Sequence, residues 1–236
     1  MTKKTFFVMG LAVVFGVLCL AGSANANIAG VTVDSFYSEN PATGRYAASL
    51  SNGSGLTGGL HDNNPFNMWM NSDATAVSQA SVNAQWLIFD LGGTYDLTSS
   101  HIWNYNEVTA WADPVTYPTY YPFWAQRRGV YEMEVSVSAD KTTWTSLGLK
   151  YLTAANGQAD PGQDVALTAA GVRYVKFDIN KNQTWSGVWT SDGSPPNPDT
   201  DYYVGLSEVQ FTGTPEPATM LLLGLGSLIL RRRKSC

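Results

Sequence analysis

The sequence predicts an all-β domain built from antiparallel strands. Apolar runs of strand length recur along the middle of the chain, separated by segments rich in glycine, proline and asparagine. The 8 Trp, 12 Tyr and 9 Phe residues favour strands, and no amphipathic helical pattern lies between the runs. Strands joined by loops in this way predict an antiparallel sandwich or barrel.

Residues 86–93, Trp-Leu-Ile-Phe-Asp-Leu-Gly-Gly, predict the central strand. Five apolar residues with one carboxylate, closed by a glycine pair, are typical of a strand buried on both faces. The preceding stretch, residues 61–69, has no periodicity and is crowded with Asp and Asn, which predicts a polar loop. Further apolar runs predict strands within residues 28–38, 100–105, 172–179 and 204–211.

Residues 131–138 show the cleanest alternation in the chain. Tyr131, Met133, Val135 and Val137 share the predicted core face, and two glutamates and two serines share the solvent face. Residues 140–143 predict a turn, after which 144–149 returns as the hairpin partner.

Two long irregular segments carry many of the aromatic residues. Residues 108–128 contain three prolines at a spacing that excludes a regular element, and residues 180–201 are also irregular. Aromatic rings exposed in loops can stack on sugars while neighbouring polar groups bond the hydroxyls. The candidate sugar-binding residues are Trp111, Tyr120, Tyr121, Trp124, Arg127, Trp185 and Trp189, whereas Trp69, Trp86 and Trp144 are assigned to packing.

The amino terminus has the order of a secretory signal peptide. Two lysines precede an apolar run over residues 6–21, and Ala24-Asn25-Ala26 follows as the A-x-A cleavage signal. We therefore expect signal peptidase to remove residues 1–26.

The carboxyl terminus, residues 214–236, contains a proline-rich start, an apolar stretch and a basic end. The Pro215-Glu216-Pro217 tripeptide leads into the apolar residues 218–230, shorter than the ~20 that span a bilayer comfortably. Basic residues after this stretch would hold its end on the cytoplasmic side of the inner membrane. They are Arg231, Arg232, Arg233 and Lys234.

In this order the three parts resemble the PEP-CTERM sorting signal of bacterial exported proteins. The resemblance implies a transient inner-membrane anchor and an exosortase-type transpeptidase that cuts near the tripeptide. Its product would be released or reattached at the cell surface or in the extracellular matrix.

Charge and cysteine content narrow the function classes. Between the two terminal signals the chain has 8 basic and 18 acidic residues, a net charge near −10, which excludes an electrostatic footprint for nucleic acid. Cys19 and Cys236 both lie in the terminal signals, so no disulfide is expected in the mature domain.

Four segments in order make residues 27–213 resemble the discoidin, or coagulation factor 5/8 type C, domain. They are the polar loop ending in Trp69, the strand 86–92, the hairpin from Val135 to Trp144, and the pair 173–177 with 206–209. The resemblance implies an eight-stranded, galactose-binding-like jelly-roll sandwich. Lys141 stands where the family's hairpin turn has glycine, and the segment 108–128 is longer than the family norm.

In sugar-binding relatives a structural calcium is held by the first loop and the acid of the last strand. This mapping implies Asp62, Asn67 and Glu208 as calcium ligands, and oxygen donors of these kinds suit a hard cation. The alternative is an Asx-rich turn that bonds only to its own backbone. No organic cofactor is expected.

Catalysis is the less favoured class. Glu132 and Glu134 lie on one strand face at a separation compatible with glycosidase chemistry, although a solvated polar face explains them as well. No G-x-S-x-G or H-E-x-x-H motif is present, and His61 and His101 are isolated.

We therefore expect an exported, non-catalytic carbohydrate-binding protein of the cell surface or exopolysaccharide matrix. The alternatives are a structural surface protein that binds protein partners and, more distantly, a glycan hydrolase.

Overall fold

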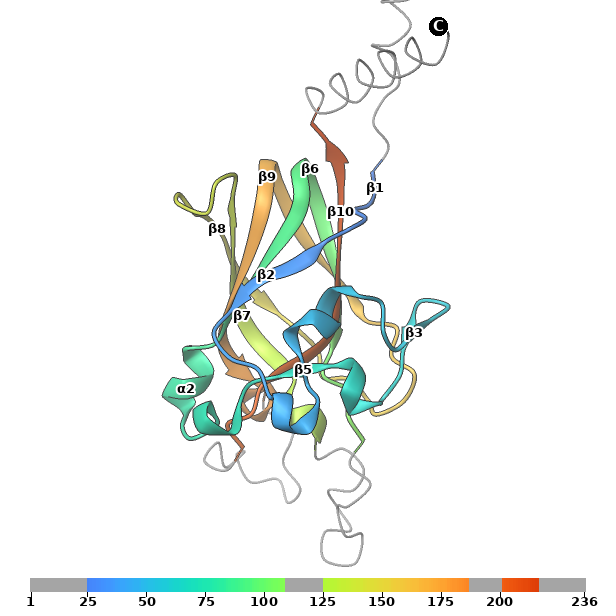
Figure 1. The fold of residues 1–236 in the computed structure, drawn as a ribbon, viewed down its shortest axis with the longest axis vertical. Coiled ribbons are helices and arrows are strands. Elements are labelled where there is room, and N and C mark those ends of the chain that lie inside the picture. Colours follow the sequence, from blue (N-terminus) through green and yellow to red (C-terminus); the bar gives the residue numbers. More distant parts are fainter. Residues whose placement is uncertain (1–24, 109–124, 187–200, 217–236) are drawn as a thin grey trace, which may run out of the picture.

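The computed structural model describes residues 25–108, 125–186 and 201–216, which form an eight-stranded sheet and a two-stranded hairpin (Figure 1). All pairings between named strands are antiparallel. The strands of the large sheet are β1 (Ala26–Asn27), β2 (Thr32–Phe36), β5 (Trp69–Met70), β6 (Trp86–Asn104), β7 (Val130–Ser138), β8 (Thr145–Tyr151), β9 (Gln163–Asn182) and β10 (Gly205–Pro215). The predicted all-β, antiparallel jelly-roll sandwich is confirmed.

Two long strands, β6 and β9, bend so that each contributes to both layers of the sandwich. Residues 86–90 of β6 pair with β2 and with the second half of β9, whereas residues 95–102 pair with β10 and with the first half of β9. The bend follows Gly92, whose φ of 74° lies in the left-handed region that glycine adopts without steric cost. The predicted strands 86–93 and 100–105 are thus parts of one strand.

Burial along the start of β6 alternates. Leu87, Phe89 and Leu91 are fully buried, while the alternate residues Trp86 and Ile88 are half-buried. The expectation that this strand is buried on both faces is therefore wrong, because one face lies on the core and the other toward the molecular surface.

The core is centred on aromatic contacts between strands. The ring of Phe89 lies 5.2 Å from that of Phe177 and 5.4 Å from that of Phe211, and the last two are 6.2 Å apart. Such tilted and edge contacts stabilise the fold by roughly 0.5–1.5 kcal/mol per pair beyond area burial. Trp69 is also fully buried, with its indole N–H donating to the Ser38 carbonyl at 2.9 Å, which confirms its packing role.

The predicted β7 and β8 hairpin is confirmed, but the face predicted to lie in solvent is partly buried. Glu132 is only 8% exposed and pairs with Lys181 of β9 at 2.8 Å. The prediction of solvent exposure is wrong for Glu132 because β9 lies alongside and supplies both the burial and the cation. In the hairpin turn, Lys141 has a φ of 63°.

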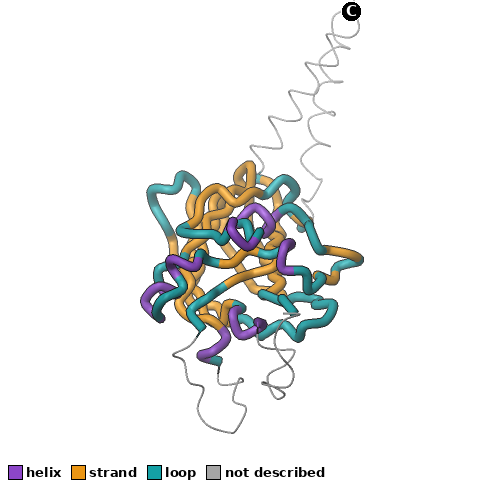
Figure 2. Tube along the Cα trace, turned by 60° about the horizontal axis from the view of Figure 1, so that its bottom comes forward, coloured by secondary structure: helices purple, strands orange, loops and turns teal. Residues whose placement is uncertain are grey.

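Short helical segments cluster at or near the lower end of the sandwich in Figure 1, and Figure 2 shows them around that end. They are α2 (Gln79–Asn83) and the 3₁₀ turns η1 (Pro41–Thr43), η2 (Ala47–Ser51), η3 (Pro65–Asn67), η4 (Asp73–Thr75), η5 (Ala125–Arg128) and η6 (Gln183–Trp185). The small hairpin joins β3 (Leu56–Thr57) to β4 (Leu60–His61) beside them. β1 and the end of β10 lie at the opposite end.

Candidate functional site

The described residues that flank segments 109–124 and 187–200 lie together at the lower end of the sandwich. The Gln126 side chain donates to the Glu107 carbonyl at 2.5 Å, and the Gln183 amide donates to the Gly129 carbonyl at 2.8 Å. Asn182 donates to the Asp201 carbonyl at 2.8 Å. We call this region the loop end, formed by η5, η6 and residues 105–108 and 201–204.

A buried polar triad lies at the loop end. Arg45 pairs with Glu107 at 2.6 Å, its Nε donates to the Tyr105 hydroxyl at 2.8 Å, and that hydroxyl donates to the other Glu107 oxygen. Arg45 is 8% exposed, Glu107 is 2% exposed and Tyr105 is fully buried. Burial, reinforced by Glu107, raises the pKa of Tyr105 far above its ordinary value. Burial opposes charge on Arg45, but Tyr105 and Glu107 raise its pKa overall.

A second ionic cluster lies beside the triad. Asp201 is 4% exposed and accepts from Arg127 at 3.3 Å and from Arg128 at 3.0 Å. The Arg128 guanidinium also lies 4.7 Å from the centre of the Tyr203 ring. Burial opposes charge on Arg128, but Asp201 raises its pKa overall. The pairs therefore hold charged groups in fixed positions under the surface of the loop end.

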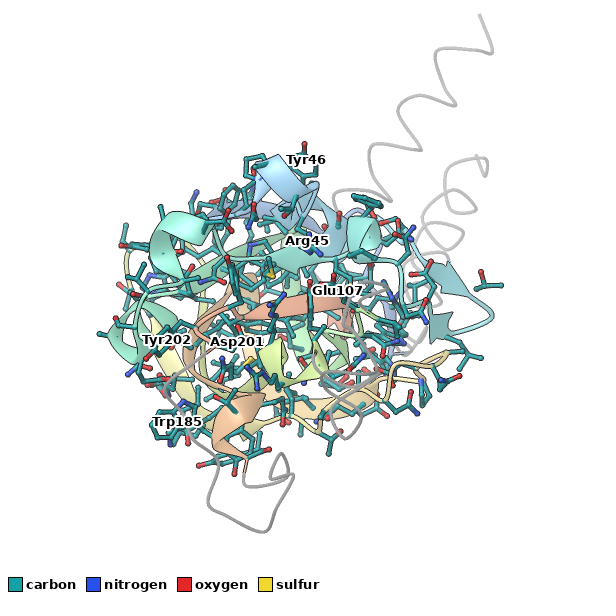
Figure 3. All side chains as sticks on the ribbon, turned by 90° about the horizontal axis from the view of Figure 1, so that it is seen from below. Arg45, Tyr46, Glu107, Trp185, Asp201 and Tyr202 are labelled. Carbon is teal, nitrogen blue, oxygen red and sulfur yellow. The ribbon has the colours of Figure 1, made fainter. Side chains whose placement is uncertain are left out.

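Exposed aromatic rings border these clusters. Trp185, at the end of η6, is 37% exposed, and its indole N–H donates to the Gln79 side chain at 2.5 Å. Tyr46 is 46% exposed. Figure 3 shows Tyr46 and Trp185 near opposite sides of the molecule seen from below, with Arg45, Glu107 and Asp201 between them.

Of the predicted sugar-binding residues, the structure describes Arg127 and Trp185. They are carried by η5 and η6, which contact one another. The other five, Trp111, Tyr120, Tyr121, Trp124 and Trp189, lie outside the described residues.

Arg45, Tyr105, Glu107 and Asp201 were not anticipated as site residues. One feature of the sequence could have indicated Arg45, which lies in a loop: it is one of only 8 basic residues between the terminal signals. Its partners are 60 and 62 positions away, a pairing that periodicity does not reveal.

The predicted calcium ligands lie in two places linked by the loop of residues 51–62. The Asp62 carboxylate accepts from the Asn67 side chain at 2.8 Å and from the Asn64 amide at 3.2 Å. The Glu208 carboxylate accepts from the Gly53 amide at 3.2 and 3.3 Å. The Asp62 amide in turn donates to the Gly55 carbonyl at 2.9 Å.

Glu208 is a buried acid without a described cation beside it. Glu208 is only 2% exposed, and this burial raises its pKa to about 7. The hydrogen bond from the Gly53 amide acts in the opposite direction and lowers the pKa. Glu208 borders a cavity of about 240 Å³ that Asn27, Ser51 and Gln210 also line. Within the described residues, no three His, Cys, Asp or Glu side chains are grouped closely enough to hold a metal ion.

Both carboxylates of the glycosidase alternative have structural partners. Glu132 is held by Lys181, and the Glu134 carboxylate accepts from the Ser146 hydroxyl of β8 at 2.7 Å. These contacts occupy the two acids within the sheet.

The end of β10 enters the proline-rich carboxyl-terminal segment. Thr214 lies opposite Asp96 of β6 and Pro215 opposite Tyr95, and the Glu216 amide donates to the Thr94 carbonyl at 3.1 Å. The family described as the PEP-CTERM protein-sorting motif matches residues 214–234. This chain carries a PEP-CTERM sorting motif. The motif indicates an exported protein that an exosortase processes.

Most of the PEP-CTERM motif lies outside the described residues, as do Ala24 of the predicted signal peptide, Pro217, Arg231, Arg232 and Arg233. Ala26, Pro215 and Glu216 are described. No helix in the described part of the chain is both long and apolar enough to cross a membrane. The predicted apolar helix 218–230 falls beyond that part.

Among solved structures, the chain is similar to proteins with family 32 carbohydrate-binding modules (CBM32). The third such module of a family 31 glycoside hydrolase from Clostridium perfringens aligns at 17% identity and a TM-score of 0.49, over 80% of this chain and 95% of that one. The family 32 module of C. perfringens NanJ, solved in complex with galactose, aligns at 12% identity and 0.47, over 80% and 99%.

The family 89 glycoside hydrolase of C. perfringens, solved with GlcNAc-α-1,4-galactose, aligns at 17% identity and a TM-score of 0.44, over 81% of this chain. The alignment spans only 15% of that hydrolase. No curated protein matches the sequence. At these identities, none of the structural alignments assigns a ligand to this chain.

Proposed function

We propose that this PEP-CTERM protein is a non-catalytic carbohydrate-binding protein of the cell surface or exopolysaccharide matrix, with its glycan site at the loop end. The observation that carries the proposal is the presentation of Trp185. The residue is 37% exposed and its indole N–H donates to the Gln79 side chain, beside the element that carries Arg127.

This arrangement suits sugar recognition for two physical reasons. An exposed indole face offers apolar area to the C–H faces of a pyranose, and its hydrogen bond limits the rotamer freedom lost on binding. The ionic clusters around Arg45 and Asp201 hold the buried side chains of the loop end in place. None of these ion pairs involves the Trp185 ring. The body's net charge near −10 favours neutral or hydroxyl-rich glycans over polyanions.

A glycan array and polysaccharide pull-down with the exported protein test this proposal. We expect Trp124→Ala and Trp185→Ala to lose binding while retaining the fold. Trp144→Ala is the matched control, because Trp144 bonds the Lys141 carbonyl in the hairpin turn at the opposite end and should leave binding unchanged. Equal losses in all three variants, or no bound glycan, would contradict a loop-end site.

The structural alternative, binding of protein neighbours, is favoured by one feature of β8. Leu149 and Tyr151 on this edge strand are 47% and 53% exposed, and Tyr151 contacts the Tyr131 ring at 5.7 Å. The structural alternative would be favoured if the protein retained matrix proteins but bound no glycan. Leu149→Lys and Tyr151→Lys should then lose the retained proteins. A hydrolase would release reducing ends from glycans, and Glu134→Gln would abolish that release.

We also propose a structural calcium ion held by Glu208, Asp62 and Asn67. Oxygen donors of these kinds suit a hard cation. Two observations at the Glu208 end of the loop support an ion there: Glu208 is a buried carboxylate with only an amide donor, and the buried Ser54 hydroxyl has no described partner. When bound, the ion would supply positive charge to the buried acid and tie residues 51–62 to β10. We expect excess chelator to lower the melting temperature, whereas an unchanged melt would refute the site.

A further inference from the structure

The sheet includes the first residues of the sorting motif. The motif match begins at Thr214, and residues 214–216 continue the ladder between β10 and β6 through positions 94–96. Thr214, Pro215 and Glu216 are each half-buried. The tripeptide therefore begins inside the folded domain rather than in the segment after it.

Pairing along β10 diminishes stepwise toward this point. At Thr212 the strand is flanked on both sides, by β6 and by β1, whose Asn27 lies opposite Thr212. A Cβ on Gly213 would lie 2.7 Å from the Asp96 carbonyl oxygen, so the two backbones approach closely there. From Thr214 to Glu216 only β6 pairs with the chain among the described residues, and the last described bond is that of Glu216 to Thr94.

Cleavage requires a peptide segment that can leave the sheet. A nucleophile must add to the scissile carbonyl carbon, after which the C–N bond breaks and the downstream segment departs as an amine that takes up a proton. Water or an acceptor amine then completes the new carboxyl end. Backbone groups in a ladder are held against a neighbouring strand, and reaching them requires local opening of the sheet.

We propose that exosortase-type processing cuts the folded protein on the carboxyl side of Glu216, so that the exported product keeps Pro215 and Glu216 as the end of β10. The folded sheet thereby sets the upstream limit of the processing site. This inference rests on the sorting motif and the β10 pairing, and glycan binding plays no part in it.

Mass spectrometry of the protein exported by exosortase-containing cells tests the proposal, through the last residue of its carboxyl-terminal peptide. We expect that residue to be Glu216 or a residue shortly after it, before the basic cluster at 231. A last residue at Pro215 or upstream would overturn the proposal, as would a product that extends to Cys236.

The variant Gly213→Val should remove the limit, because its side chain meets the Asp96 backbone and forces the strands apart. We expect additional product ends upstream of Glu216 in this variant. Thr214→Val is the matched control, since it adds a strand-favouring side chain without that clash, and its product should end as the wild type does. Identical ends in wild type and Gly213→Val would count against the sheet as the limit.

Hydrogen exchange on the purified, folded chain gives an independent readout if Gly213→Val fails to fold. We expect the Glu216 amide to exchange at least about tenfold more slowly than in a synthetic peptide of residues 210–220. Equal exchange rates in protein and peptide would overturn the proposal.

Discussion

Arg45 and Glu107 form an ion pair 2.6 Å long in which both side chains are more than nine-tenths buried. The pair joins the loop before η2 to the residues that follow β6. Because Tyr105 bonds both partners, removing either residue leaves a buried polar group unsatisfied.

We predict that Arg45→Met lowers the free energy of unfolding by about 3 kcal/mol, since it leaves the Glu107 charge buried and unpaired. The double variant Arg45→Met/Glu107→Leu should cost less than Arg45→Met alone, because it removes both charges. Chemical denaturation measures both. Arg173→Met is the control: its pair with Asp90 is 45% exposed on the arginine side, and its loss should cost much less than the loss of the buried pair. A double variant that is no more stable than Arg45→Met would contradict the account.

Glu208 should make stability fall as pH rises. Its pKa is about 7 in the folded protein and near 4.5 when unfolded, so the folded state binds more protons between these values. The metal-free protein should therefore lose about 2–3 kcal/mol from pH 4.5 to pH 8 relative to Glu208→Gln, in which this titration is absent. Urea titrations across this range, in chelator, give the difference between the two proteins. Parallel pH profiles would show that the acid is not perturbed.

Calcium should reverse that trend if Glu208 is a ligand, because the ion binds the deprotonated carboxylate. At pH 8 we expect added calcium to raise the melting temperature of the wild type and to leave that of Glu208→Gln unchanged. An equal rise in both proteins would place the calcium effect elsewhere.

Lys141 should store backbone strain in the β7 and β8 turn, because its φ of 63° is unfavourable for a residue with a Cβ. Lys141→Ala and Lys141→Gly both lose the exposed pair with Asp34, but only glycine relieves the strain. We predict that the glycine variant is about 1 kcal/mol more stable than the alanine variant by thermal denaturation. The opposite order would mean that the turn has another conformation in solution.

The strands that are best predicted from sequence are those whose period matches one buried face. Residues 131–138 and 144–149 form the expected hairpin, and the apolar run from Trp86 starts β6. The lengths of β6, β9 and β10 were underestimated because polar residues continue these strands where pairing with neighbouring strands satisfies their backbone groups. Glu132 is buried for a similar reason, since Lys181 comes from a strand that local periodicity does not place beside it.

The sequence predicted residues of the candidate site only where the residue type and its place in a loop were enough to indicate an exposed binding residue. An exposed Trp185 followed from its place in an irregular, aromatic segment. The partners of Arg45 and Asp201 depend on which loops meet at the loop end, a property of the whole topology.

The most direct test of the central claim is a ¹⁵N spectrum of the tryptophan indole N–H groups, recorded while the folded protein is titrated with glycans that it retains on an array. The account predicts a dose-dependent shift of the Trp185 signal, assigned by its absence in Trp185→Ala. The signal of buried Trp69 should stay in place. Glycans that leave the Trp185 signal unmoved, or shift only that of Trp144, would contradict a carbohydrate site at the loop end.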